Sequence, residues 1–223
     1  MRVILLLLLA FPARGETVTV AVASNFLSTF ETLAEAWEDE TGHEVAVASG
    51  ATGLLYAQIV RGAPFDLFLA ADAARPARLA ERGPVRTYAV GRLALWGLDG
   101  ADRSDLDGSV PRLAIANPET APYGLAAREV MEAHGPDAET VLTGENAAQA
   151  FLFARTGNAD LAFVPLAFVR DDPRTWVVPP EMHAPIRQDM VLLHDTAAAR
   201  ALFEWLGSAD ARAAIRAAGY GAP

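Results

Sequence analysis

Apolar residues in the first half of the chain switch repeatedly between the period of a strand and the period of a helix. Residues 17–23 alternate and are rich in β-branched side chains, which predicts a strand. Phe30, Leu33 and Trp37 then recur at helical spacing, with glutamates on the other faces. The same criteria predict strands at 44–48 and 66–70 and helices at 54–61 and 76–82. Strand, helix, strand, helix, strand is the order expected of a parallel α/β sheet.

A second set of the same kind follows. Residues 87–96 are expected to form one strand that leaves the first lobe, and residues 190–193 a strand that returns to it. The other predicted elements are strands at 112–116, 160–164 and 176–178 and helices at 124–134, 145–156, 196–206 and 210–218. We therefore expect an α/β fold of two lobes, with two hinge crossings and an interlobe cleft. Lobe I is expected to hold residues 16–94 and 190–223, and lobe II residues 95–189.

Residues 1–15 have the pattern of a secretory signal peptide. A short positive start is followed by an apolar run from Val3 to Phe11, and small residues precede Glu16. The apolar run is too short for a membrane-spanning helix, which needs about 20 residues. We therefore expect the segment to be removed and the rest of the protein to be free in the periplasm or outside the cell.

The charge of the chain argues against some partners and chemistries. It has 18 basic residues, all of them arginine, against 28 acidic ones. Removing residues 1–15 takes away Arg2 and Arg14 and no acid, so the net charge changes from −10 to about −12. Such a chain is not expected to bind nucleic acid. Without lysine or cysteine, it also has no Schiff-base residue and no thiol nucleophile.

Four points where a strand ends and a helix begins are rich in small and hydroxyl-bearing residues. They are Ala23-Ser24-Asn25, Ser49-Gly50-Ala51-Thr52-Gly53, Ala121-Pro122-Tyr123-Gly124 and Glu145-Asn146-Ala147. Backbone N–H groups at the start of a helix lack partners within the helix and can bind an anion. Each corner alone is explained by helix capping. Two corners in each of two lobes predict instead a single anion site.

The donors of this predicted site carry no charge. Ser24, Asn25 and Thr52 are expected to supply hydroxyl and amide donors, and Tyr123 and Ala147 backbone N–H groups. Uncharged dipoles can replace the hydration shell of a dianion. A site without an acceptor rejects a protonated anion, because the O–H of that anion is left unpaired. These properties favour molybdate, tungstate or sulfate over hydrogen phosphate.

Two acidic residues stand beside the corners, and a site without an acceptor requires both to point away from it. Glu119 and Glu145 are expected to face solvent, since a carboxylate in the site would oppose the anion.

Ten short segments, in the same order along nearly all of the chain, carry a resemblance to a known family. They are Val20-Ala-Val-Ala-Ser-Asn-Phe26, Ser49-Gly-Ala-Thr-Gly53, Tyr56-Ala-Gln-Ile59, Gly62-Ala-Pro-Phe-Asp66, Ala70-Ala-Asp72, Ala116-Asn-Pro118, Ala121-Pro-Tyr-Gly124, Gly144-Glu-Asn146, Ala162-Phe-Val164 and Ala218-Gly-Tyr220. They resemble the periplasmic molybdate-binding proteins of ABC transporters. Each motif is weak alone, whereas the ordered set is strong.

The resemblance implies a type II periplasmic binding protein fold. It also implies molybdate as ligand, with tungstate as a second one, a membrane ABC permease as partner, a monomer, and no cofactor. The metal would enter only as part of the oxyanion. The positions that match the anion-binding positions of the family are Ser24, Asn25, Thr52, Tyr123 and Ala147. Pro165 stands where one branch of the family has a tyrosine that reaches the anion, so this chain resembles the other branch.

Two alternatives remain open at this point. The same fold can hold sulfate or another small anion, and a secreted α/β hydrolase is a candidate from another class. A hydrolase needs a nucleophile, a base and an orienting group within reach of one another. The chain has no G-x-S-x-G motif, and its four histidines form no ligand pair at i, i+4. We therefore expect a binding protein and not an enzyme, with no catalytic residue and no side-chain metal site.

Overall fold

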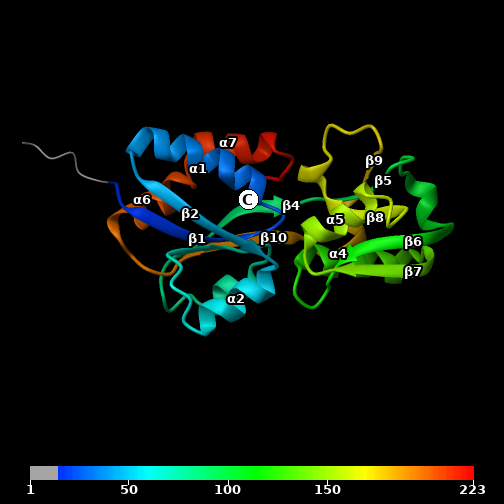
Figure 1. Ribbon diagram of the computed structural model, residues 1–223, viewed down its shortest axis with the longest axis horizontal. Helices are drawn as coiled ribbons and strands as arrows, with labels where there is room; N and C mark the ends of the chain where they lie inside the picture. The colour runs from blue at the N-terminus through cyan, green and yellow to red at the C-terminus, as the bar shows by residue number, and fades with distance from the viewer. Residues whose placement is uncertain (1–14) are drawn as a thin grey trace, which may run out of the picture.

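Two five-stranded sheets, one in each lobe, organise the protein (Figure 1). The computed structural model describes residues 15–223, so the predicted signal peptide lies outside the described residues apart from Gly15. The predicted two-lobed α/β fold is confirmed. None of the helices within residues 15–223 is both long enough and apolar enough to cross a bilayer.

The sheet of lobe I has the strand order β2-β1-β3-β10-β4. Its strands are β1 (Thr17–Ala23), β2 (Glu44–Gly50), β3 (Leu67–Leu69), β4 (Val85–Gly91) and β10 (Ile186–Leu192). β1 is parallel to β2 and β3, whereas β10 is antiparallel to both β3 and β4. The sheet is therefore mixed and not wholly parallel. β1 runs toward lobe II, whereas β10 comes from lobe II and runs in the opposite direction.

The sheet of lobe II repeats this plan with the order β7-β6-β8-β5-β9. Its strands are β5 (Leu93–Gly97), β6 (Ser109–Ala116), β7 (Asp137–Gly144), β8 (Leu161–Pro165) and β9 (Thr175–Val177). β6 is parallel to β7 and β8, and β5 is antiparallel to β8 and β9. β6, β7 and β8 thus take the places that β1, β2 and β3 have in lobe I.

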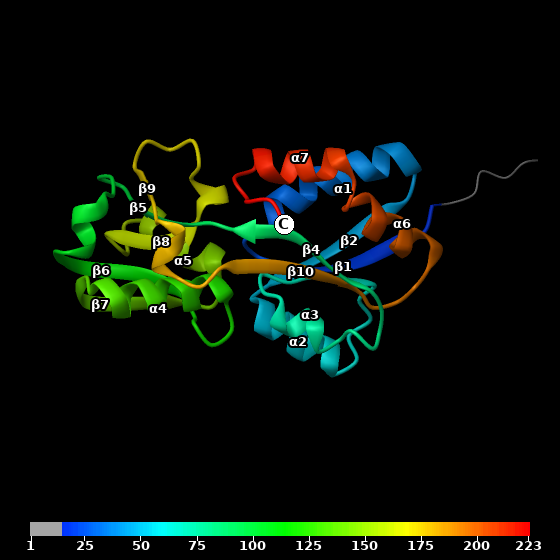
Figure 2. The same cartoon turned by 180° about the vertical axis from the view of Figure 1, so that it is seen from behind.

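The two crossings between the sheets lie side by side in the middle of the molecule (Figure 2). The apolar run expected to be one strand is two, β4 and β5, which lie in different sheets on either side of Arg92. The chain returns to lobe I at Ile186, where β10 begins. The chain therefore passes from the first sheet to the second at Arg92 and returns at Ile186. The lobe boundaries expected from the sequence lie after residue 94 and before residue 190. A continuous apolar run does not reveal where a strand changes sheets.

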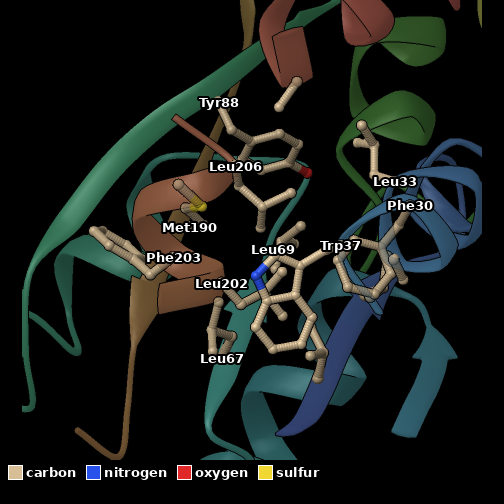
Figure 3. Packing of buried hydrophobic residues seen from close by; sticks show 14 of the residues in the cluster. Phe30, Leu33, Trp37, Leu67, Leu69, Tyr88, Met190, Leu202, Phe203 and Leu206 are labelled. Carbon is tan, nitrogen blue, oxygen red and sulfur yellow. The ribbon is translucent and has the colours of Figure 1, made fainter. Parts of the chain in front are cut away.

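Helices cover both faces of the first sheet. α1 (Leu27–Thr41), α6 (Ala197–Trp205) and α7 (Ala209–Ala217) lie on one face, and α2 (Thr52–Val60) and α3 (Ala74–Ala77) on the other (Figures 1 and 2). Figure 3 shows Phe30, Leu33 and Trp37 of α1 in one buried cluster with residues of β3 and α6. Burial of these side chains stabilises α1 against the sheet. It also fixes the loop between β1 and α1.

Lobe II has one long helix on each face of its sheet. α4 (Pro122–His134) buries Ala127 and Val130 on one face, and α5 (Ala147–Arg155) buries Ala154 on the other. Short 3₁₀ helices complete the lobe: η1 (Arg103–Leu106), η2 (Leu166–Phe168) and η3 (Pro180–Met182). A Cβ atom at Gly124 would overlap the carbonyl oxygen of Ala116. Glycine therefore allows the first turn of α4 to lie directly against the end of β6.

Two local features differ from the expectations. Strand β7 was not predicted, because it is an edge strand whose side chains are mostly exposed and give no apolar signal. Helix α1 begins at Leu27, with Phe26 at its N-cap and no side-chain cap. Ser24 and Asn25 are therefore not capping residues.

Candidate functional site

The four strand-to-helix corners meet where the two lobes face each other. In lobe I, Ala23 at the end of β1 pairs with Gly50 at the end of β2, so the two strands end side by side. In lobe II, Ala116 and Gly144 end β6 and β7 in the same way. The carboxyl edge of a parallel sheet is where α/β proteins bind ligands. Each lobe therefore presents a pair of adjacent corners to the other.

One small cavity joins the four corners. Its lining includes every residue predicted for the anion site, namely Ser24, Asn25, Thr52, Tyr123 and Ala147, together with small residues such as Ala23, Gly50 and Ala71. The cavity measures about 10 Å³, close to the roughly 10–15 Å³ that a single water requires. A larger hollow of about 520 Å³, lined by residues 167–174, includes none of the corners.

Two hydroxyl groups line the cavity from lobe I. The Thr52 side chain is buried, and its Oγ1 accepts a hydrogen bond from the backbone N–H of Ala71 at 3.0 Å. That bond occupies a lone pair and leaves the hydroxyl proton free to donate to a ligand. The Ser24 hydroxyl makes no hydrogen bond to any other residue in the described part of the chain, so it too is available.

Backbone N–H groups complete the donor set. Those of Asn25, Thr52, Tyr123 and Ala147 donate to no acceptor among residues 15–223. The last three lie in the first turns of α2, α4 and α5, where the helix has no partner for them. The partial positive charge of three helix ends is therefore directed at the same cavity.

The side chain of Asn25 does not act as expected. Its Nδ2 donates to Gln188 Oε1 at 3.0 Å and to Tyr220 Oη at 3.5 Å, so both amide protons are used inside the protein. The contribution of Asn25 to the cavity is thus its backbone N–H. Gln188 was not predicted. It lies in the polar run Arg187-Gln188-Asp189 of β10, and only the structure shows that its side chain is fully buried.

No charged side chain lines the cavity within residues 15–223. Glu119 is exposed and forms an ion pair with Arg128 at 2.9 Å, and Glu145 is exposed as well. His183 lies outside the cavity lining, where its Nδ1 lies 2.8 Å from the carbonyl oxygen of Ala184. In the described residues, no group of three His, Asp or Glu side chains is arranged to hold a metal ion.

Phenol groups behind the cavity are kept neutral. Burial raises the pKa of Tyr123 and of Tyr88 well above the ordinary range of a tyrosine. Both hydroxyls are therefore protonated throughout the neutral range and serve as hydrogen-bonding groups without charge.

The two lobes also touch beside the cavity. The backbone N–H of Gly53 in lobe I donates to the carbonyl oxygen of Thr120 in lobe II at 2.8 Å. Arg75 Nη2 donates to the carbonyl oxygen of Glu119 at 3.2 Å. These contacts join the two lobes directly beside the corners.

The sequence matches other proteins over almost its whole length. A family model described as bacterial extracellular solute-binding protein matches residues 18–221. The molybdate-binding protein ModA of Rhodobacter capsulatus is 41% identical over 230 residues, covering 95% of this chain and 91% of that protein. The molybdate-binding protein ModA of Azotobacter vinelandii is also 41% identical, covering 96% of this chain and 93% of its own.

Solved structures agree with the sequence relatives. The periplasmic molybdate-binding protein of Azotobacter vinelandii matches with a TM-score of 0.82 and 34% sequence identity, covering 92% of this chain and 99% of that chain. The sulfate-binding protein SubI of Mycobacterium tuberculosis H37Rv matches with a TM-score of 0.67 at 16% identity, covering 92% and 86%, which shows a shared fold alone. The chain belongs to the bacterial extracellular solute-binding proteins and has their two-lobed, type II periplasmic binding protein fold.

Proposed function

We propose that this protein captures molybdate, and tungstate as a second ligand, for delivery to a membrane ABC permease. The observation that carries the proposal is the set of uncharged donors that both lobes direct at one small cavity. Hydroxyl groups and helix N-termini stabilise a dianion by replacing its hydration shell. Two relatives that are 41% identical and named molybdate-binding proteins support the choice of anion.

Selectivity would have two sources. No carboxylate lines the cavity, so the O–H of a hydrogen phosphate ion would find no carboxylate acceptor there. Molybdate and sulfate carry the same charge, so size has to separate them. Metal–oxygen bonds are longer than sulfur–oxygen bonds, and donors spaced for the larger ion would not all reach the smaller one.

We further propose that the protein performs no chemistry. The residues that line the cavity include the hydroxyl-bearing Ser24, Thr52 and Tyr123 but no histidine, carboxylate or other base to activate one of them. The protein would act after export, as a monomer that closes around the anion and releases it at the permease. Closure would follow from tighter binding of the ion by the closed lobes than by the open ones.

Titration calorimetry of the purified protein tests the choice of ligand. Molybdate and tungstate should bind tightly, sulfate more weakly, and phosphate not at all. A protein that binds sulfate as tightly as molybdate would contradict the molybdate proposal and favour the sulfate alternative.

The substitution Thr52→Val tests the hydroxyl donor, because valine keeps the shape and removes the O–H. The affinity for molybdate should fall by about 1–3 kcal/mol, since one oxygen of the buried anion loses its partner. The matched control is Thr140→Val on the exposed edge of β7, which should bind like the unmodified protein. Equal affinities of the two variants would show that Thr52 is not a ligand.

The pH dependence of molybdate binding tests whether the cavity contains a side chain that ionises near neutral pH. Tyr123 is the one titratable residue in the cavity lining, and burial raises its pKa and that of Tyr88 well above the ordinary range, so both keep their protons. Molybdate affinity should therefore stay constant between about pH 6 and 9, a range in which an ordinary histidine would titrate. A titration step inside this range, measured by calorimetry at several pH values, would reveal an ionising group in the site.

A further inference from the structure

A network of uncharged side chains lies directly behind the cavity. We call it the Gln188 network; its members are Asn25, Tyr88, Tyr123, Gln188 and Tyr220. All five side chains are buried, and no buried side-chain polar atom in the described residues lacks a hydrogen-bond partner. Buried polar groups have to be paired, so the geometry of such a network is strongly specified.

Gln188 is the centre of this network. Its Oε1 accepts from Asn25 Nδ2 and from Tyr88 Oη, both at 3.0 Å. Its Nε2 donates to Tyr123 Oη at 3.1 Å. Asn25 and Tyr88 belong to lobe I, whereas Tyr123 belongs to α4 of lobe II. The bond from Gln188 to Tyr123 therefore joins the two lobes.

The same two residues that Gln188 holds also contribute to the cavity. Asn25 and Tyr123 each line it and present a backbone N–H with no protein acceptor among residues 15–223. Their side chains point the other way, into the network. One amide group thus fixes the distance between an N–H of lobe I and an N–H of lobe II.

The chain at the first crossing is shaped to permit this contact. Gly91 is the last residue of β4, and a Cβ atom there would overlap Tyr123 Oη and lie 2.8 Å from Gln188 Nε2. A side chain at position 91 would therefore push the tyrosine ring away from the amide.

We infer that Gln188 is a positioning residue that latches the closed lobes around the anion. The inference rests on the proposed function. The latch requires that the hydrogen bond between Gln188 and Tyr123 breaks when the lobes separate, while the bonds of Gln188 to Asn25 and Tyr88 stay within lobe I. The latch therefore stabilises only the closed form, and its loss should appear in the rate of ligand release.

The substitution Tyr123→Phe removes the latch and keeps the backbone N–H of residue 123. Stopped-flow measurements should show release of molybdate about three- to tenfold faster, the effect of one uncharged hydrogen bond, with little change in the binding rate. The melting temperature of the ligand-free protein should not change, because the bond is absent from the open form. A bond with a merely structural role would lower that temperature.

Two further test variants, one double variant and two control variants complete the design. Gln188→Met should speed release as well. Combining it with Tyr123→Phe should add little to the release rate, because both remove the same contact between the lobes and the other bonds of Gln188 lie within lobe I. Gly91→Ala should also speed release, because its added Cβ overlaps the tyrosine hydroxyl. Its control is Gly108→Ala, whose added Cβ would lie at an ordinary contact distance of 3.5 Å from its nearest neighbour. Tyr56→Phe, on α2 and outside the cavity lining, is the control for the loss of a phenol hydroxyl.

Release rates of Tyr123→Phe and Gln188→Met equal to that of the unmodified protein would overturn the inference, and so would fully additive effects. All rates should be measured with molybdate, tungstate and sulfate. If the unmodified protein binds only sulfate, the molybdate proposal is overturned. The role of Gln188 is then still decided by comparing the rate of sulfate release from each variant with that from the unmodified protein.

Discussion

The proposed function depends on one electrostatic constraint, which is that a dianion would have to be held without a positively charged residue. Opposite charge would be the simpler solution, but no arginine lines the cavity, and the whole chain has net charge −10. Dipoles are weaker than full charges and act over short distances, so several have to converge within hydrogen-bond range. A single helix end does not suffice. The fold must therefore bring several helix ends to one point and keep them there.

The repeated plan of the two sheets meets this need. In each lobe, two parallel strands end in register and are followed by loops that lead into helices, which yields two corners side by side. The two crossings place these edges opposite each other, with the Gln188 network behind the cavity and the contact between Gly53 and Thr120 beside it. The packing of α1 and α4 on their sheets then keeps the donors from shifting.

The sequence predicted the residues that line the small cavity better than it predicted the boundaries of the strands. The lining residues lie in short local motifs at strand ends, where small and hydroxyl-bearing residues have a direct physical meaning. The break at Arg92 and the edge strand β7 were missed because apolar patterning does not record which sheet a strand joins, nor an edge strand with exposed side chains. Gln188 was missed for a different reason. Its partners Asn25 and Tyr123 are 163 and 65 residues away in sequence, and no local pattern relates them. The orientation of the Asn25 side chain follows from the same distant contact.

The most direct measurement of the central claim is the position of the metal in crystals grown with tungstate, read from its anomalous scattering. An anion site at the four corners predicts one strong peak in the cavity, with the tungstate oxygens within hydrogen-bond distance of Ser24, Thr52 and the N–H groups of Asn25, Tyr123 and Ala147. A peak elsewhere on the molecule, or an ion held by an arginine side chain, would contradict it.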